Sequence, residues 1–338
     1  MALTALRTKT LATPRTKTFT TPHTKRSTPM PDSPRESPEF PGSPESTGSP
    51  EHPEKSLDSL ILHATDNAVS WITLNRPEAM NALTWDQRER VIVLLAAASA
   101  DPDVRAVVIT ATGRGFCAGA DLRGGTPGGE PVAGGPVPGA RLTGEPVPGA
   151  RVAGDISRTL RLGAQRLIAA VLDCEKPVIA AVNGTAAGIG AHLAFACDLV
   201  LAAESAKFIE VFARRGLVPD GGGAYLLPRL IGPQRAKELM FFGDALTAAD
   251  AERIGLVNRV VPPDELEKTA RTWSERLATG PTRALALTKQ LVNASLDTDR
   301  GTAFAAEAAA QEINMTTRDA REGVASFVER RGPVFKGR

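Results

Sequence analysis

Between residues 68 and 203 the sequence alternates between short apolar segments and segments with helical spacing. The apolar segments AVSWITLNRP, VRAVVITATG, KPVIAAVNG and DLVLAA are expected to be strands, the first broken by Pro77. TWDQRERVIVLLAAASAD is predicted to be a helix capped by Thr84, and DISRTLRLGAQRLIAAVLDC and AHLAFAC are predicted to be further helices. Strand, helix and strand in succession indicate crossover connections, so an α/β fold with a largely parallel sheet is expected over residues 56–262.

From Pro263 onward the pattern contains only helices. The predicted helical segments are PDELEKTARTWSERLATG, PTRALALTKQLVNASL, GTAFAAEAAAQEINMTT and a short one in DAREGVASFVERRGPVFKGR. They contain many alanines and few large apolar residues, which fits packing against a neighbouring subunit. Residues 263–338 are therefore predicted to be a helical oligomerisation region.

Two segments have compositions that do not suit a core. Residues 1–55 contain three copies of a basic octad, RTKTLATP, RTKTFTTP and HTKRSTPM, followed by four Ser-Pro steps. Such a segment buries too little apolar area to offset its chain entropy, so a disordered tail is predicted, either dispensable or produced by a start codon placed too far upstream. Residues 123–155 are rich in Pro and Gly and repeat PVPGAR, which indicates a functional loop or a tolerated insertion.

The totals exclude several function classes. Forty basic against 38 acidic side chains leave a net charge of +2, and aromatic residues make up only 4% of the chain, so neither a nucleic-acid nor a membrane partner is indicated. No apolar run approaches the roughly 20 residues that span a bilayer. Three scattered cysteines are too few for a disulfide framework or a metal site, so a cytoplasmic protein with reduced thiols is expected.

Two stretches consist largely of Gly and Ala at positions where a helix is expected to begin after a buried strand. They are GRGFCAGADL, residues 113–122, and NGTAAGIGAHL, residues 183–193. Small residues let a ligand approach main-chain N–H groups, and in parallel α/β folds ligands favour the carboxyl ends of strands. Tight strand–helix packing explains either stretch alone, whereas the pair at matching topological positions favours two donors that converge on one oxygen, an oxyanion hole.

Five ordered motifs resemble the enoyl-CoA hydratase/isomerase superfamily, also called crotonase. They are LNRPEAMNAL, GFCAGADL, KPVIAAVNGTAAGIGAHLAFACDLVLAAESAKF, GLVPDGGGAYLLPRLIG and ADAERIGLVNRVV, and the resemblance runs from Leu57 to Arg338 except for the insertion. It implies a spiral of ββα repeats, a C-terminal trimerisation region, and a homotrimer or dimer of trimers. It also implies an acyl-CoA thioester substrate with no separate cofactor, whose oxygen accepts N–H bonds from Ala120 and Ile189.

The resemblance also limits the chemistry. Family hydratases carry glutamates at the positions of His192 and Phe212, so water addition by two carboxylates is not supported here. Asp220 in LVPDGGG matches a carboxylate that some family isomerases use, and the surrounding motifs are most similar to the ring-epoxyphenylacetyl-CoA isomerase branch. A single carboxylate in an apolar pocket can shuttle a proton along the acyl chain. A turn or cap role for Asp220 is the structural alternative.

His192 and Glu210 are less determined by the sequence. His192 matches a family catalytic position, so it is predicted to hold a water, to orient Asp220, or to pack in the core. Glu210 is predicted to form a salt bridge with Arg214 or Arg215.

Residues that bind the carrier are assigned from the resemblance alone. Those predicted to contact CoA or the acyl group are Met80, Ala82, Ala118, Asp121, Leu122, Gly188, Phe212, Phe327 and Arg330, the last two capping the nucleotide, often from a neighbouring subunit.

Three functions therefore stay open at this point. The first is an enoyl-CoA isomerase centred on Asp220. The second is an enoyl-CoA hydratase of fatty-acid or aromatic-acid degradation, with His192 or Asp220 activating water. The third is a binding protein of the same fold without turnover, its basic tail touching RNA.

Overall fold

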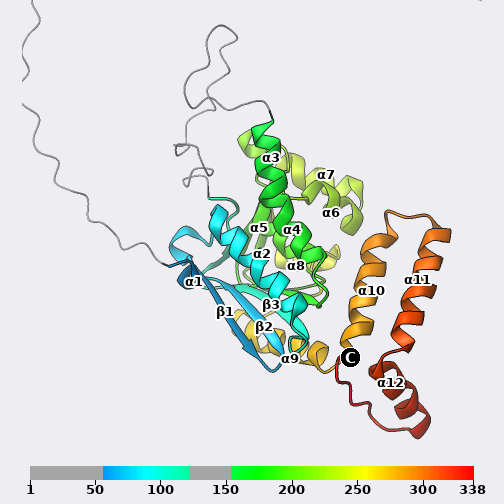
Figure 1. The fold of residues 1–338 in the computed structure, drawn as a ribbon. Helices are drawn as coiled ribbons and strands as arrows, with labels where there is room; N and C mark the ends of the chain where they lie inside the picture. Colours follow the sequence, from blue (N-terminus) through cyan, green and yellow to red (C-terminus); the bar gives the residue numbers. More distant parts are fainter. Residues whose placement is uncertain (1–55, 122–153) are drawn as a thin grey trace, which may run out of the picture. The chain divides into compact units, whose positions relative to one another are not determined.

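The computed structural model of the protein describes residues 56–121 and 154–338. The predicted tail, residues 1–55, lies outside the described residues, as do Leu122 and nearly all of the predicted insertion at 123–155. The α/β alternation expected between these segments is confirmed, and from Pro263 onward the described residues form only helical elements (Figure 1).

The strands form two sheets rather than one. The larger has the order β1-β2-β3-β5-β7-β10 and the smaller β4-β6-β8-β9. Only the β1–β2 and β8–β9 pairs are antiparallel. The larger sheet contains β1 (Ile61–Asp66), β2 (Val69–Leu74), β3 (Ala106–Ala111), β5 (Val178–Val182), β7 (Leu199–Ala203) and β10 (Arg259–Val261), and the smaller contains β4 (Gly115–Cys117), β6 (Thr185–Ala187), β8 (Lys207–Ile209) and β9 (Ala245–Thr247).

From β3 to β8 consecutive strands alternate between the two sheets. The prediction that each small-residue stretch leads directly from a buried strand into a helix is therefore wrong. Each stretch first contributes a short strand, β4 or β6, to the smaller sheet. These strands have three residues each, too few for an alternating pattern to be visible in the sequence.

Helices cover the sheets and their connections. The first eight are α1 (Leu57–Leu60), α2 (Trp85–Ala100), α3 (Asp155–Leu162), α4 (Ala164–Leu172), α5 (Ile189–Ala196), α6 (Gly223–Ile231), α7 (Pro233–Phe242) and α8 (Ala248–Arg253), and short 3₁₀ turns span Pro77–Ala79, Ala213–Arg215 and Pro263–Glu265. Thr84 caps α2 as predicted, because its hydroxyl accepts the Gln87 N–H while the Gln87 side chain accepts the Thr84 N–H.

The single helix predicted from Asp155 to Cys174 is instead two helices, α3 and α4. They are separated at Gly163, whose backbone is not helical (φ −109°, ψ −91°). A Cβ at Gly163 would lie 2.8 Å from the Trp85 ring, so the break occurs where the chain packs closely against α2. Helical periodicity on both sides of the glycine hides this break from a reading of the sequence.

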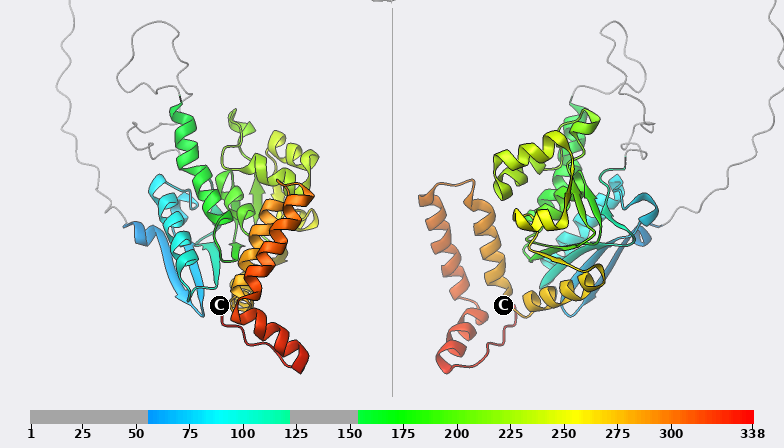
Figure 2. Two further views of the ribbon diagram at one scale, coloured as in Figure 1. Left: turned by 45° about the vertical axis from the view of Figure 1, so that its right-hand side comes forward. Right: turned by 180° about the vertical axis from the view of Figure 1, so that it is seen from behind.

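The larger sheet is covered on both faces. On one face Val69, Val108, Ile179 and Leu201 form a cluster with residues of α9 (Leu266–Ala278). On the other face the main core joins apolar residues of α2, α4 and α5 to those of both sheets. Figure 2 shows α9 beneath the sheet and well separated from the helices above it. The C-terminal region thus begins as part of the core.

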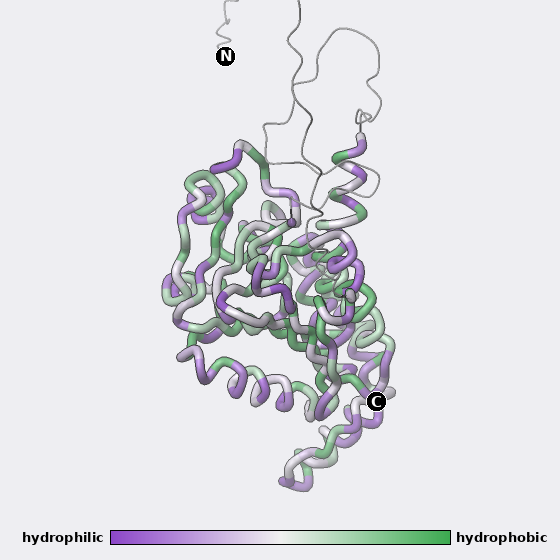
Figure 3. Tube along the Cα trace, turned by 90° about the vertical axis from the view of Figure 1, so that its left-hand side faces the viewer, coloured by the Kyte–Doolittle hydropathy of each residue, from purple (hydrophilic) through white to green (hydrophobic). Residues whose placement is uncertain are grey.

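The last three helices extend beside this core. They are α10 (Thr282–Ser295), α11 (Arg300–Met315) and α12 (Arg318–Glu329), and α10 and α11 run antiparallel (Figures 1 and 2). Along them the hydropathy alternates between polar and apolar residues (Figure 3). Within the described part of the chain, no helix is both long and apolar enough to cross a membrane.

Candidate active site

The first small-residue stretch presents a free main-chain donor. Leu83 N–H donates to the Gly119 carbonyl oxygen (2.8 Å), and Asp121 N–H donates to the Leu83 carbonyl oxygen (3.0 Å). Because N–H groups point to alternate sides of an extended segment, the N–H of Ala120 points away from Leu83. Among the described residues it has no acceptor.

The second stretch presents another donor. Ile189 is the first residue of α5, and the first N–H groups of a helix have no intrahelical acceptor. Gly188 precedes it with φ +53°, a left-handed value that favours glycine, and its N–H donates to the Ile209 carbonyl oxygen (3.0 Å). A Cβ at Gly190 would lie 2.2 Å from the Cys117 carbonyl oxygen, so the start of α5 lies directly against β4.

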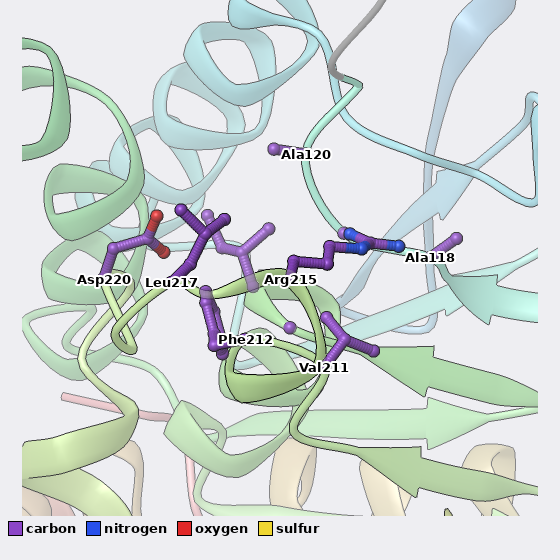
Figure 4. A pocket seen from close by; sticks show the side chains of 10 residues that line it. Ala118, Ala120, Val211, Phe212, Arg215, Leu217 and Asp220 are labelled. Atoms are coloured by element: carbon purple, nitrogen blue, oxygen red, sulfur yellow. The ribbon is translucent and has the colours of Figure 1, made fainter. Parts of the chain in front are cut away.

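Both donors lie at one pocket. Its lining residues are Ala118, Gly119, Ala120, Gly188, Ile189, Val211, Phe212, Arg215, Leu217 and Asp220. Figure 4 shows the Asp220 carboxylate pointing into the pocket from one side, with Ala120 on another. The structure thus brings together the predicted oxyanion donors and the predicted base, which lie up to 100 residues apart in the sequence (residues 120 and 220).

Asp220 is the only carboxylate among the described residues that line the pocket. Burial raises its pKa above the ordinary value for aspartate, and the nearby charges of His192 and Arg88 partly oppose this rise. Gln165 donates its side-chain amide to the main-chain oxygen of Asp220 (3.5 Å), which holds the backbone at this position. A carboxylate with a raised pKa is a better proton acceptor and donor near neutral pH than an ordinary one.

His192 lies behind the pocket rather than on its surface. Its ring is fully buried, stacks on Phe212 (5.4 Å between ring centres), and its Nε2 lies 3.0 Å from Glu210 Oε2. The predicted salt bridge of Glu210 with Arg214 or Arg215 is therefore wrong. Glu210 follows the end of β8 and its carboxylate turns into the core, while Arg214 pairs with Asp244 on the surface.

The segments predicted to line the CoA path lie beside Ala120, the first predicted oxyanion donor. Ala118 N–H donates to the Met80 carbonyl oxygen (2.9 Å), which ties residues 80–83 to residues 118–121. Ala82, within the first of these segments, is buried. The Asp121 carboxylate is buried and pairs with Arg76 (2.5 Å). Asp121 thus holds the stretch that carries Ala120.

The other predicted binding residues are divided between two places. Gly188 and Phe212 line the pocket. Phe327 lies on α12 and is 85% exposed, Arg330 follows the last residue of that helix, and neither lines the pocket of its own chain.

Sequence reasoning missed two residues that shape the site. Asn81 is buried with φ +56°, and its side-chain amide donates to the carbonyl oxygens of Thr112 and Gly115 and accepts the Arg76 N–H. It therefore joins the EAMNAL segment to the turn before β4. Arg215, at the end of a 3₁₀ turn, places a cation at the pocket. The sequence signal for Asn81 is the residue type itself, because Asn adopts the left-handed backbone conformation more readily than most residues.

None of the three cysteines is among the residues that line the pocket. The three cysteines are free, as predicted, and all three are buried. Burial raises the pKa of Cys117 to about 12, so it stays a poorly nucleophilic thiol at neutral pH. Within the described residues no three His, Cys, Asp or Glu side chains gather in a group that would hold a metal ion.

Comparisons with known proteins identify the family. A family model described as enoyl-CoA hydratase/isomerase matches residues 64–133 and 152–338. A protein named probable enoyl-CoA hydratase from Rhodobacter capsulatus is 37% identical over 82% of this chain and 98% of its own length. The 1,2-epoxyphenylacetyl-CoA isomerase of Escherichia coli is 36% identical over 82% of this chain and 99% of its own.

Solved structures give the same result. The crystal structure of an enoyl-CoA hydratase from Bacillus anthracis superposes with a TM-score of 0.71 at 31% identity, covering 82% of this chain and 100% of that one. The predicted fold class, a crotonase-like α/β structure with C-terminal helices, is confirmed. Nearly full-length matches in both sequence and structure show that this chain belongs to the enoyl-CoA hydratase/isomerase family, as an enzyme that acts on acyl-CoA thioesters.

Proposed function

We propose that the protein moves a double bond along an enoyl-CoA chain by shuttling one proton through Asp220. The Asp220 carboxylate takes a proton from C2 of a 3-enoyl-CoA, and the electron pair passes to the thioester oxygen. This oxygen accepts hydrogen bonds from the N–H groups of Ala120 and Ile189. Return of the proton to C4 re-forms the thioester carbonyl and leaves a 2-enoyl-CoA. No atom is gained or lost.

The observation that carries this proposal is that Asp220 supplies the single carboxylate among the described residues that line the pocket. Proton shuttling needs one base with a suitable pKa, whereas water addition in the family's hydratases uses two carboxylates. Here those two positions hold His192 and Phe212, and Phe212 is a pocket-lining side chain that cannot titrate. The E. coli isomerase relative supports the same reaction class. Hydration is the second candidate, favoured by the name of the R. capsulatus relative.

Heavy water distinguishes these two reactions. We expect the purified protein, given a 3-enoyl-CoA in heavy water, to form the 2-enoyl isomer without the mass of an added water. Crotonyl-CoA should exchange protons at its γ-carbon but should not be hydrated. Mass spectrometry and the ultraviolet absorption of the conjugated thioester measure both outcomes. Conversion of crotonyl-CoA to a hydroxyacyl-CoA at a rate comparable to isomerisation would instead establish the hydratase.

The CoA-binding roles predicted from the family belong to the same proposal. Met80, Ala82, Ala118, Asp121 and Leu122 would line the path of the carrier. Support comes from the main-chain bonds that join residues 80–83 to residues 118–121 at the pocket.

We further propose that the helices of residues 263–338 assemble the chain into a trimer. Support comes from large apolar side chains that are exposed on α10, α11 and α12 and directly after α10, namely Val292, Leu296, Phe304, Ile313, Met315, Val324, Phe327 and Val328. Burying such residues supplies about 1.5–3 kcal/mol each. Sedimentation equilibrium should give three chains or a multiple of three, and a stable monomer would contradict the assignment. Phe327 and Arg330 would then reach the nucleotide of a neighbouring subunit.

A further inference from the structure

The buried pair His192–Glu210 has no role in the reaction as described so far. His192 is 0% and Glu210 4% exposed, and their nearest atoms, Nε2 and Oε2, are 3.0 Å apart. A buried carboxylate without a partner is costly, and the imidazole Nε2 is the partner that the fold gives to Glu210. Neither side chain lines the pocket, so neither is expected to touch the substrate.

The pair lies directly under the turn that carries Asp220. A Cβ at Gly221 would lie 3.0 Å from His192 Nδ1, and a Cβ at Gly223 only 2.1 Å from Nε2. Phe212, which lines the pocket, stacks on the same ring with an angle of 12° between planes. The ring therefore supports the 220–223 turn and a pocket wall at once, which explains why glycines follow Asp220.

The charges around Asp220 give the pair an electrostatic direction. Burial raises the pKa of Asp220, while His192 on α5 lowers it most among the neighbouring charges, followed by Arg88 on α2. Glu210 raises this pKa, but it is the smallest of these influences. Arg215 is a further charged group at the same pocket. The imidazole end of the pair thus acts more strongly on Asp220 than the carboxylate end.

We infer that His192 and Glu210 form a positioning pair for Asp220, which supports its turn from below and directs positive charge at its carboxylate. This inference rests on the proposed function, because it assumes that Asp220 is the base. Glu210 holds the imidazole in place at Nε2, and the imidazole lowers the pKa of Asp220 against the effect of burial. Arg88 acts in the same direction from the other helix.

The test is the pH dependence of kcat/KM for isomerisation of a 3-enoyl-CoA. In His192→Gln the acid limb should move to higher pH by about 1 unit, the lower end of the usual effect of a neighbouring opposite charge. The rate below the limb should then fall about tenfold, and the rate above it should stay close to that of the parent. Glu210→Gln should move the limb in the same direction by less. This change weakens the hold on His192, which lowers the pKa of Asp220, but it also removes Glu210, which raises that pKa.

Phe195→Leu is the matched control. Phe195 is the other aromatic ring on α5, is also buried, and stacks on Phe208 (5.1 Å) much as His192 stacks on Phe212. This change should lower the melting temperature without moving the pH profile. If His192→Gln does not fold, Glu210→Gln decides, because its amide conserves the shape and can still accept the Nε2–H.

Two results separate this inference from the proposed function. If Asp220→Asn loses isomerisation while the acid limb of His192→Gln or Glu210→Gln is unchanged, the pair is only structural and the inference is wrong. If Asp220→Asn keeps isomerisation, the proposed base itself is wrong. A limb that moves in both pair variants, and not in Phe195→Leu, supports the inference.

Discussion

Replacing Asp220 with Asn should lower isomerisation of a 3-enoyl-CoA by about 10²–10⁴-fold, the usual contribution of a general acid–base group. Asn conserves the shape of the side chain but cannot accept a proton from C2. In the parent protein the rate should rise with pH as Asp220 ionises. This limb should lie above the ordinary range of aspartate, because burial raises the pKa of Asp220. In the variant the limb should disappear.

The stability of this variant is the internal control. A raised pKa means that the folded state binds the proton of Asp220 more tightly than the unfolded state does. The ionised form is thus disfavoured by folding at pH values above the unfolded-state pKa, and a neutral amide avoids that cost. The melting temperature at neutral pH should therefore be maintained or rise. An Asp220→Asn protein that retains activity would show that another group is the base.

Replacing Gly190 with Ala should have the second largest effect. The new Cβ would lie 2.2 Å from the Cys117 carbonyl oxygen and 2.7 Å from the Cys117 Cβ, so α5 must move away from β4. Ile189 begins α5 and Ala120 lies three residues after Cys117, so this movement separates the two proposed donors. Losing one such donor typically lowers the rate by about 10²–10³-fold. Overpacking of this kind also costs about 1–3 kcal/mol of stability.

Gly323→Ala provides the matched control for this change. Gly323 also lies in a helix, α12, but an added Cβ there meets only the Phe335 ring at 3.6 Å, an ordinary contact. This control should keep full isomerase activity and an unchanged or higher melting temperature, since Ala is the better helix former. Both the melting temperature and kcat should be measured. Full activity in Gly190→Ala would mean that the start of α5 is not part of the oxyanion site.

Local features of the sequence were sufficient for the secondary structure of most of the core. Thr84 in TWDQ predicts the start of α2 because a capping box needs only residues 84–87. The helices from Leu266 to Glu329 were likewise predicted from periodicity within each segment. The same reading did not detect the break at Gly163, where the chain packs closely against the Trp85 ring of another helix.

For the candidate site, the sequence by itself determined which residues are available, and the tertiary structure decided what each of them faces. The small residues around Ala120 and Ile189 and the lone carboxylate of Asp220 are visible in the sequence, and the fold places all three at one pocket. The partner of Glu210 was not visible. An extended segment after β8 offers Glu210 either Arg214 nearby or His192, which is 18 residues away. The tertiary structure buries the Glu210 carboxylate beside the His192 ring, and a buried carboxylate needs a partner. Arg214 remains on the surface, where it pairs with Asp244.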